Sequence, residues 1–119
     1  MKMTPTVMIV EDEVLIALGL EDAFQEEGYE VAGSFATCAD ALACLAKRPP
    51  DLAVVDAMLK DGSCLELARE LRRRDVPFLI YSGRNSFAEE PPEMDGILWV
   101  EKPAPAPSVV RAAAALLAR

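Results

Sequence analysis

Short apolar runs alternate with longer amphipathic stretches along the whole chain. Five short apolar runs, each bounded by polar residues, predict buried strands at Val7 to Val10, Tyr29 to Phe35, Leu52 to Val55, Pro77 to Tyr81 and Ile97 to Val100. Apolar side chains at helical spacing predict helices at Val14 to Glu27, Thr37 to Lys47, Ser63 to Arg74 and Ser108 to Arg119. This alternation of strand and helix predicts a parallel sheet with helices on both of its faces.

Helix boundaries are marked by residues that start or stop a helix. Gly28 follows the first predicted helix, where a glycine commonly ends one. Thr37 and Ser63 can cap the amino ends of the second and third helices through their hydroxyl groups. Pro49 and Pro50 end the second helix, because proline cannot continue it.

Composition limits the classes of protein to which the chain can belong. Its 119 residues suit one compact domain, residues 1–119, and 52% of them are hydrophobic, which excludes general disorder. The formal net charge of -8 argues against direct binding to nucleic acid. No apolar run approaches the roughly 20 residues of a membrane span. The three cysteines form no metal-binding motif, so we expect small packing residues and a cytoplasmic location.

Polar residues with complementary chemistry follow four of the predicted strands. Glu11 and Asp12 follow the first strand, Asp56 the third, Ser82 the fourth and Lys102 the fifth. The carboxyl ends of parallel strands share one edge of a sheet, so these groups are expected to converge there. Clustered carboxylates repel one another, and oxygen ligands suit Mg²⁺. The pattern therefore predicts Mg²⁺-assisted phosphoryl transfer onto Asp56.

Four short motifs occur in the order and at the spacing found in a known family. They are V-E-D-E (Val10 to Glu13), V-V-D-A-M-L (Val54 to Leu59), Y-S-G (Tyr81 to Gly83) and E-K-P (Glu101 to Pro103). From about Thr6 to its end, the chain resembles the receiver domains of bacterial two-component response regulators. The resemblance implies a flavodoxin-like three-layer α/β sandwich with a five-stranded parallel sheet in the order 2-1-3-4-5.

The resemblance also implies roles for the acidic residues. Asp56 matches the phosphoacceptor of the family. Glu11 and Asp12 match its acidic pair, with Asp12 as the direct metal ligand. The main-chain carbonyl of Met58, two residues after the acceptor, matches a further metal ligand. Mg²⁺ is thus the implied cofactor.

Three other positions match the parts of the family that sense the phosphoryl group. Ser82 matches the hydroxyl residue that moves toward the phosphoryl group, and Lys102 matches the lysine that binds it. Trp99 lies where the family often has a Tyr or Phe that changes rotamer on activation. The peptide between Lys102 and Pro103 matches one that is commonly cis in the family.

Two features depart from the family pattern. The segment Arg84 to Gly96 normally holds a regular helix, but Pro91 and Pro92 interrupt it here. We expect that helix to be short, shifted or irregular. Trp99 is bulkier than Tyr or Phe, which alters the expected switch.

The resemblance implies a signalling switch rather than a classical enzyme. Its phosphodonor would be a sensor histidine kinase or a phosphotransferase, and its target an unidentified downstream protein. No nucleic acid or membrane is expected as a direct partner, and a homodimer is left open.

Three other interpretations are weighed against this one. A phosphatase with an aspartyl-phosphate intermediate would need a second acid at position 58, where the chain has Met58. A degenerate receiver used only for protein interaction is disfavoured by Asp56, Lys102 and the acidic pair. The chain could also be the receiver fragment of a larger response regulator or hybrid kinase.

Overall fold

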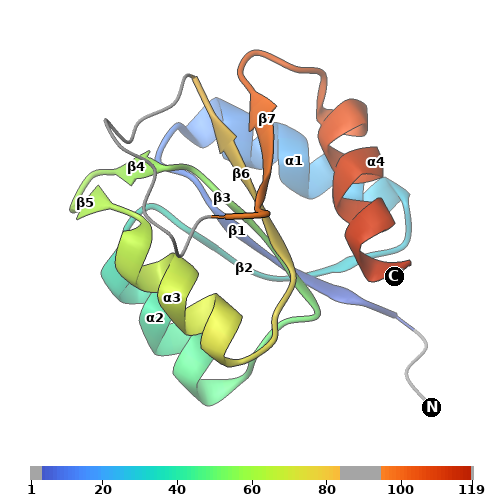
Figure 1. Cartoon of the computed structure of the whole chain (residues 1–119). Coiled ribbons are helices and arrows are strands. Elements are labelled where there is room, and N and C mark those ends of the chain that lie inside the picture. Colours follow the sequence, from blue (N-terminus) through green and yellow to red (C-terminus); the bar gives the residue numbers. More distant parts are fainter. Residues whose placement is uncertain (1–3, 84–94, 119) are drawn as a thin grey trace.

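A five-stranded parallel sheet forms the centre of the molecule (Figure 1). The computed structural model describes residues 4–83 and 95–118. The strands of this sheet are β1 (Thr6–Val10), β2 (Glu30–Phe35), β3 (Leu52–Val55), β6 (Phe78–Ser82) and β7 (Leu98–Glu101). Their order across the sheet is β2-β1-β3-β6-β7, which is the predicted order 2-1-3-4-5.

Helices cover both faces of the sheet and complete the predicted three-layer α/β sandwich. The four helices within the described residues are α1 (Val14–Glu26), α2 (Cys38–Lys47), α3 (Leu65–Arg73) and α4 (Ala106–Leu117). Helices α1 and α4 pack on one face, and α2 and α3 pack on the other (Figure 1). The flavodoxin-like prediction is therefore confirmed.

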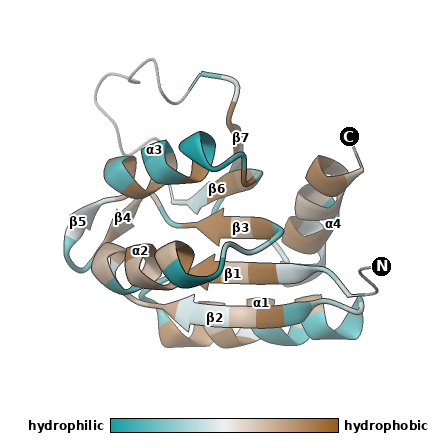
Figure 2. Cartoon of the chain, turned by 90° about the horizontal axis from the view of Figure 1, so that it is seen from below, coloured by the Kyte–Doolittle hydropathy of each residue, from teal (hydrophilic) through white to brown (hydrophobic). Residues whose placement is uncertain are grey.

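The alternation of side chains along each central strand builds two separate cores. On β1, Met8 and Val10 face the core beneath α2 and α3, whereas Val7 and Ile9 face the core beneath α1 and α4. Figure 2 shows the hydrophobic character of β1 and β3. Because both faces of these strands are buried, they appear in the sequence as continuous apolar runs.

Most predicted boundaries lie within two residues of the observed ones. Gly28 has φ +90° just after α1, a conformation that favours glycine. The Thr37 hydroxyl accepts a hydrogen bond of 3.2 Å from the Asp40 backbone N–H, so Thr37 caps α2 as predicted. Helix α4 begins at Ala106 rather than Ser108, because Pro107 is compatible with the first turn of a helix.

The start of α3 differs from the prediction. A two-stranded antiparallel hairpin, β4 (Met58–Leu59) and β5 (Gly62–Ser63), precedes the helix. The residue at the cap position of α3 is therefore Cys64. The Ser63 hydroxyl still accepts a hydrogen bond of 3.1 Å from the Leu65 backbone N–H.

Two of the three cysteines lie in the core of the molecule. Cys38 and Cys64 are buried, and burial raises the pKa of Cys38 to about 11 and of Cys64 to about 12. Both thiols are therefore packing groups, as predicted.

The expectation of an irregular helix in Arg84 to Gly96 falls largely on residues 84–94, outside the described residues. No helix in the described chain is long and apolar enough to cross a membrane.

Candidate functional site

The predicted polar residues meet at the carboxyl edge of the sheet. Neighbouring strand ends are joined there by backbone hydrogen bonds, from Asp56 N–H to the Val10 carbonyl (2.9 Å) and from Lys102 N–H to the Ser82 carbonyl (2.8 Å). Glu11 and Asp56 directly follow β1 and β3, and both are buried. The parallel register of the strands therefore gathers residues that are far apart in the sequence.

Lys102 is the centre of this cluster. Its ammonium nitrogen lies 2.8 Å from Glu11 Oε1, 3.1 Å from Asp56 Oδ2 and 3.2 Å from Glu13 Oε2. The Lys102 side chain is only 11% exposed, and its nitrogen lies 5.5 Å from the centre of the Tyr81 ring. An ammonium group has three N–H donors, so three carboxylates occupy all of them.

Burial and the ion pairs act in opposite directions on the charges of the cluster. Burial raises the pKa of Glu11, while the Lys102 ammonium and the Glu13 backbone N–H lower it by smaller amounts. For Lys102, burial alone would lower the pKa. The hydrogen bonds to Glu11 and Asp56 outweigh burial, and the pKa of Lys102 is raised. Lys102 is therefore firmly protonated at neutral pH.

Three carboxylates at this edge have the composition of a divalent-cation site. One carboxylate oxygen from each of Glu11, Asp12 and Asp56 lies within 4.8 Å of the others. Mg²⁺ prefers oxygen ligands and keeps bound water, whereas softer metals prefer nitrogen or sulfur ligands. Met58 lies two residues after Asp56, and its backbone N–H donates a 3.3 Å hydrogen bond to Asp56 Oδ1. The residues present therefore fit a magnesium ion.

The hairpin after Asp56 is held in place by a residue for which sequence analysis assigned no role. The Asp61 carboxylate accepts hydrogen bonds from the backbone N–H groups of Cys38 (2.9 Å) and Ala39 (3.1 Å) at the start of α2. These N–H groups, that of Cys38 most strongly, lower the pKa of Asp61. Asp61 thereby ties the segment that carries Met58 to the amino end of α2.

Tyr81 and Pro103 shape the segment that follows Lys102. The Tyr81 hydroxyl donates to the Ala104 carbonyl (2.9 Å) and accepts from the Ala104 backbone N–H (3.1 Å). The peptide between Lys102 and Pro103 is cis, as the resemblance implied. The sequence did not predict the contact between Tyr81 and Ala104, because the residues around a tyrosine in a strand do not indicate what its hydroxyl group will bind.

Ser82 and Trp99 lie on adjacent strands near Lys102. Ser82 is the last residue of β6 and only 4% exposed. Trp99 is half-buried on β7, opposite Ile80 in register, and packs against the core beneath α2 and α3. Ser82 and Trp99 thus lie on β6 and β7, the two strands next to Lys102. Their roles in switching stay predictions.

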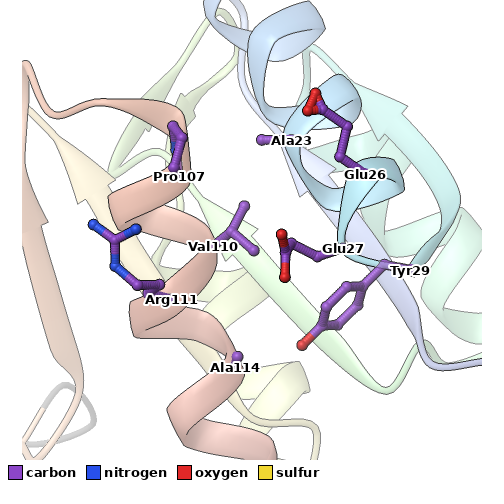
Figure 3. Close-up of a pocket in the computed structure, with 8 residues that line it drawn as sticks. All are labelled: Ala23, Glu26, Glu27, Tyr29, Pro107, Val110, Arg111 and Ala114. Carbon is purple, nitrogen blue, oxygen red and sulfur yellow. The ribbon is translucent and has the colours of Figure 1, made fainter.

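A separate pocket of ≈ 450 Å³ lies between α1 and α4 (Figure 3). Among its lining residues are Glu26 and Glu27 at the end of α1, Tyr29 just beyond it, and Val110 and Arg111 on α4. Helix α1 starts at the carboxyl edge and is 13 residues long, so its last residue lies about 18 Å from its first. This pocket therefore does not form part of the acidic cluster.

Comparison with known proteins identifies the family. A model of the response regulator receiver domain matches residues 7–113. The transcriptional regulatory protein AruR of Pseudomonas aeruginosa is 36% identical over 109 residues, which cover 85% of this chain. Among solved structures, SdrG of Sphingomonas melonis Fr1 is 31% identical with a TM-score of 0.81, and each chain is covered completely. The receiver domain of PhyR from Erythrobacter litoralis is 30% identical with a TM-score of 0.77, covering 97% of this chain and 90% of that one.

The curated relatives are longer than this chain. The match covers 41% of AruR and 36% of AfsQ1, a transcriptional regulatory protein of Streptomyces coelicolor. In this chain, the four motifs, the fold and the family model over residues 7–113 all indicate a receiver domain. The chain belongs to the family of response regulator receiver domains, which are signalling switches rather than classical enzymes.

Proposed function

We propose that this receiver domain accepts a phosphoryl group on Asp56 with the help of Mg²⁺. The observation that carries the proposal is the position of the Asp56 carboxylate. It is buried, hydrogen-bonded to a protonated lysine and within reach of two further carboxylates that can hold a cation. A structural aspartate at a strand end would need neither the lysine nor the additional acids.

In the proposed reaction, a carboxylate oxygen of Asp56 forms a bond to phosphorus. The bond between phosphorus and the donor breaks, and the donor leaves with that electron pair. Lys102 then donates a hydrogen bond to a phosphoryl oxygen, as does the Ser82 hydroxyl. Bound Mg²⁺ would neutralise the charge that develops on the phosphoryl oxygens.

The proposed ligands for that ion are the carboxylates of Glu11, Asp12 and Asp56 and the main-chain carbonyl of Met58. Asp12 is the most accessible of the three carboxylates, because it is half-buried while Glu11 and Asp56 are buried. We therefore assign Asp12 as a direct ligand.

The phosphodonor is proposed to be a protein, either a sensor histidine kinase or a phosphotransferase. Apolar side chains at the start of α1 support this proposal, because Val14, Leu15 and Leu18 are 69%, 84% and 49% exposed beside the acidic edge. An exposed apolar patch of this kind marks a protein contact. An encounter in the cytoplasm would bring the donor's phosphohistidine to Asp56.

Phosphorylation is proposed to act on a downstream protein through Ser82 and Trp99. Ser82 and Lys102 interact more favourably with a dianionic phosphoryl group than with the unphosphorylated site. Only such a difference in interaction energy can shift a conformational equilibrium. Trp99 is the only tryptophan in the chain, so its fluorescence reports this shift. We expect beryllofluoride, a phosphoryl mimic, to change the emission in wild type, less in Ser82→Ala and not at all in Asp56→Asn.

The proposed function is tested by incubating the protein with acetyl phosphate and Mg²⁺ and measuring its intact mass. Wild type is expected to gain one phosphoryl group, and the gain is expected to disappear when Mg²⁺ is chelated. Asp56→Asn is the matched variant, since it keeps the size of the side chain and removes the nucleophilic carboxylate. An equal gain of mass in Asp56→Asn would refute the assignment.

A further inference from the structure

Glu13 differs from the other two carboxylates that contact Lys102. Glu11 and Asp56 have side chains that are 2% and 9% exposed, and both also belong to the group that can hold a cation. The Glu13 side chain is 63% exposed, and Glu13 is not a member of that group. Glu13 is thus a contact of Lys102 that metal binding would leave in place.

The backbone of Glu13 is held by hydrogen bonds, while its side chain is largely exposed. Its N–H donates a 3.1 Å hydrogen bond to Glu11 Oε2, and its carbonyl accepts the first backbone hydrogen bond of α1, from Ala17. Glu13 occupies the cap position of α1, yet its carboxylate accepts no capping hydrogen bond. The carboxylate instead reaches Lys102, at 3.2 Å.

We propose that Glu13 is a positioning residue that holds Lys102 in the unphosphorylated protein and competes with the phosphoryl group for it. This inference rests on the proposed function of Asp56. All three Lys102 donors are occupied, so binding a phosphoryl oxygen requires one carboxylate contact to be released. The exposed Glu13 side chain is the one that water can stabilise after release.

A second effect acts in the same direction. The dianionic group on Asp56 and the Glu13 carboxylate would both lie beside Lys102, and like charges repel. Removing the charge of Glu13 is therefore expected to strengthen binding of a phosphoryl group. Exposed ion pairs have modest energies, so the expected change in affinity is about two- to fivefold.

The variant Glu13→Gln isolates the charge. Glutamine keeps the length of the side chain and an oxygen that can accept a hydrogen bond from Lys102. The matched control is Asp22→Asn, because Asp22 is an exposed residue of α1 about 13 Å further along the helix and its change removes the same net charge. Thermal unfolding of each variant checks that the fold is retained.

The experiment is a titration with beryllofluoride followed by ¹⁹F NMR. It is performed at low ionic strength, with the Mg²⁺ concentration shown to be saturating for each variant. We expect Glu13→Gln to lower the Kd of beryllofluoride two- to fivefold relative to wild type, and Asp22→Asn to leave it unchanged. The difference is expected to shrink as salt is added, because salt screens exposed charges.

Failure of this inference and failure of the proposed function give different results. If wild type binds beryllofluoride and Glu13→Gln binds with the same or a higher Kd, the role of Glu13 is overturned while the role of Asp56 stands. An equal gain in affinity in Asp22→Asn would also overturn it, since net charge would then explain the effect. Wild type that binds no beryllofluoride with Mg²⁺ would overturn both.

Discussion

Two charged clusters in this molecule use the same kinds of ion pair in very different surroundings. At the carboxyl edge of the sheet, Lys102 contacts three carboxylates and is 11% exposed. At the end of α3, Glu70 contacts Arg73 and Arg74, and their side chains are 27%, 66% and 28% exposed, respectively. The first cluster joins residues from strand ends that are up to 91 positions apart, whereas the second joins neighbours on one helix.

The difference in burial explains why only the first cluster suits chemistry. Water and ions screen the exposed pairs on α3, so they contribute little to stability and cannot perturb a reacting group. Around Lys102, Glu11 and Asp56 at the carboxyl edge, water is largely excluded, and each of these three charges depends on the others for its stabilisation. An anion or cation that enters this edge therefore changes the energy of every group in it.

The largest effect is expected for Lys102→Met, which removes the ammonium from the buried cluster. Glu11 and Asp56 would remain buried without a cation, so the free energy of unfolding in metal-free buffer should fall by roughly 3 kcal/mol. Mg²⁺ should restore part of that loss, because it can replace the missing positive charge. Urea unfolding with and without Mg²⁺ measures both effects.

The matched variant for Lys102→Met is Arg73→Met, which removes a cation from the exposed cluster. Its unfolding curve is expected to overlay that of wild type. Similar losses of stability in the two variants would show that burial is not what separates the clusters.

The next largest effect is expected for Asp12→Ala in the presence of Mg²⁺. A ligand at ten times its Kd raises the free energy of unfolding by about 1.4 kcal/mol, and this gain should be absent in the variant. Without metal, the variant should be at least as stable as wild type, because one repelling carboxylate is gone. Melting curves of Asp12→Ala with and without Mg²⁺ make the measurement, with Asp22→Ala as the control. If Mg²⁺ stabilised Asp12→Ala as much as wild type, Asp12 would not be a metal ligand.

An intermediate effect is expected for Asp61→Asn, which changes an exposed carboxylate that accepts hydrogen bonds from two backbone N–H groups at the start of α2. The bonds from Cys38 and Ala39 lower the pKa of Asp61 in the folded protein, so the ionised form stabilises the fold above the unfolded pKa of about 3.9. That stabilisation disappears as the pH falls through the folded pKa.

We therefore expect Asp61→Asn to lower the melting temperature by about 3 °C at pH 7. The difference between the two proteins should become smaller below pH 4. Melting curves of both proteins at pH 7 and pH 3 make the measurement. A difference that is independent of pH would argue against a role for the charge.

The smallest effects are expected in the exposed cluster, for Glu70→Gln as for Arg73→Met. The contacts of Glu70 with Arg73 and Arg74 lie on the helix surface, so the melting temperature should change by no more than about 1 °C. The change should vanish in 0.5 M salt. A large loss that persists in salt would mean that this cluster, too, is structurally essential.

The sequence predicts the strands and the residues that end them, because burial on both faces leaves a continuous apolar run. Val7 to Val10 and Leu52 to Val55 are such runs, and each is followed by an acid that the structure brings to Lys102. The parallel topology then determines which ends converge, and the motifs of the family narrow the chemistry. These parts of the site follow from local pattern plus one global rule.

Contacts that depend on three-dimensional placement could not be predicted. In the sequence, Glu13 could equally be an acidic residue that stabilises the amino end of a helix. Only the structure shows its contact with Lys102. Asp61 reaches the start of α2 across 23 positions of sequence. The strands Met58–Leu59 and Gly62–Ser63 have two residues each, which is too short for an alternating pattern to reveal them.

The most direct test of phosphorylation on Asp56 is to locate the phosphoryl group itself. The protein is incubated with acetyl phosphate and Mg²⁺, treated with borohydride, which reduces an aspartyl phosphate to homoserine, and digested for peptide mass spectrometry. We expect homoserine at position 56 and at no other acidic position, with none formed when Mg²⁺ is chelated. Reduction at Asp12 or any other acid, with residue 56 still aspartate, would contradict phosphorylation on Asp56.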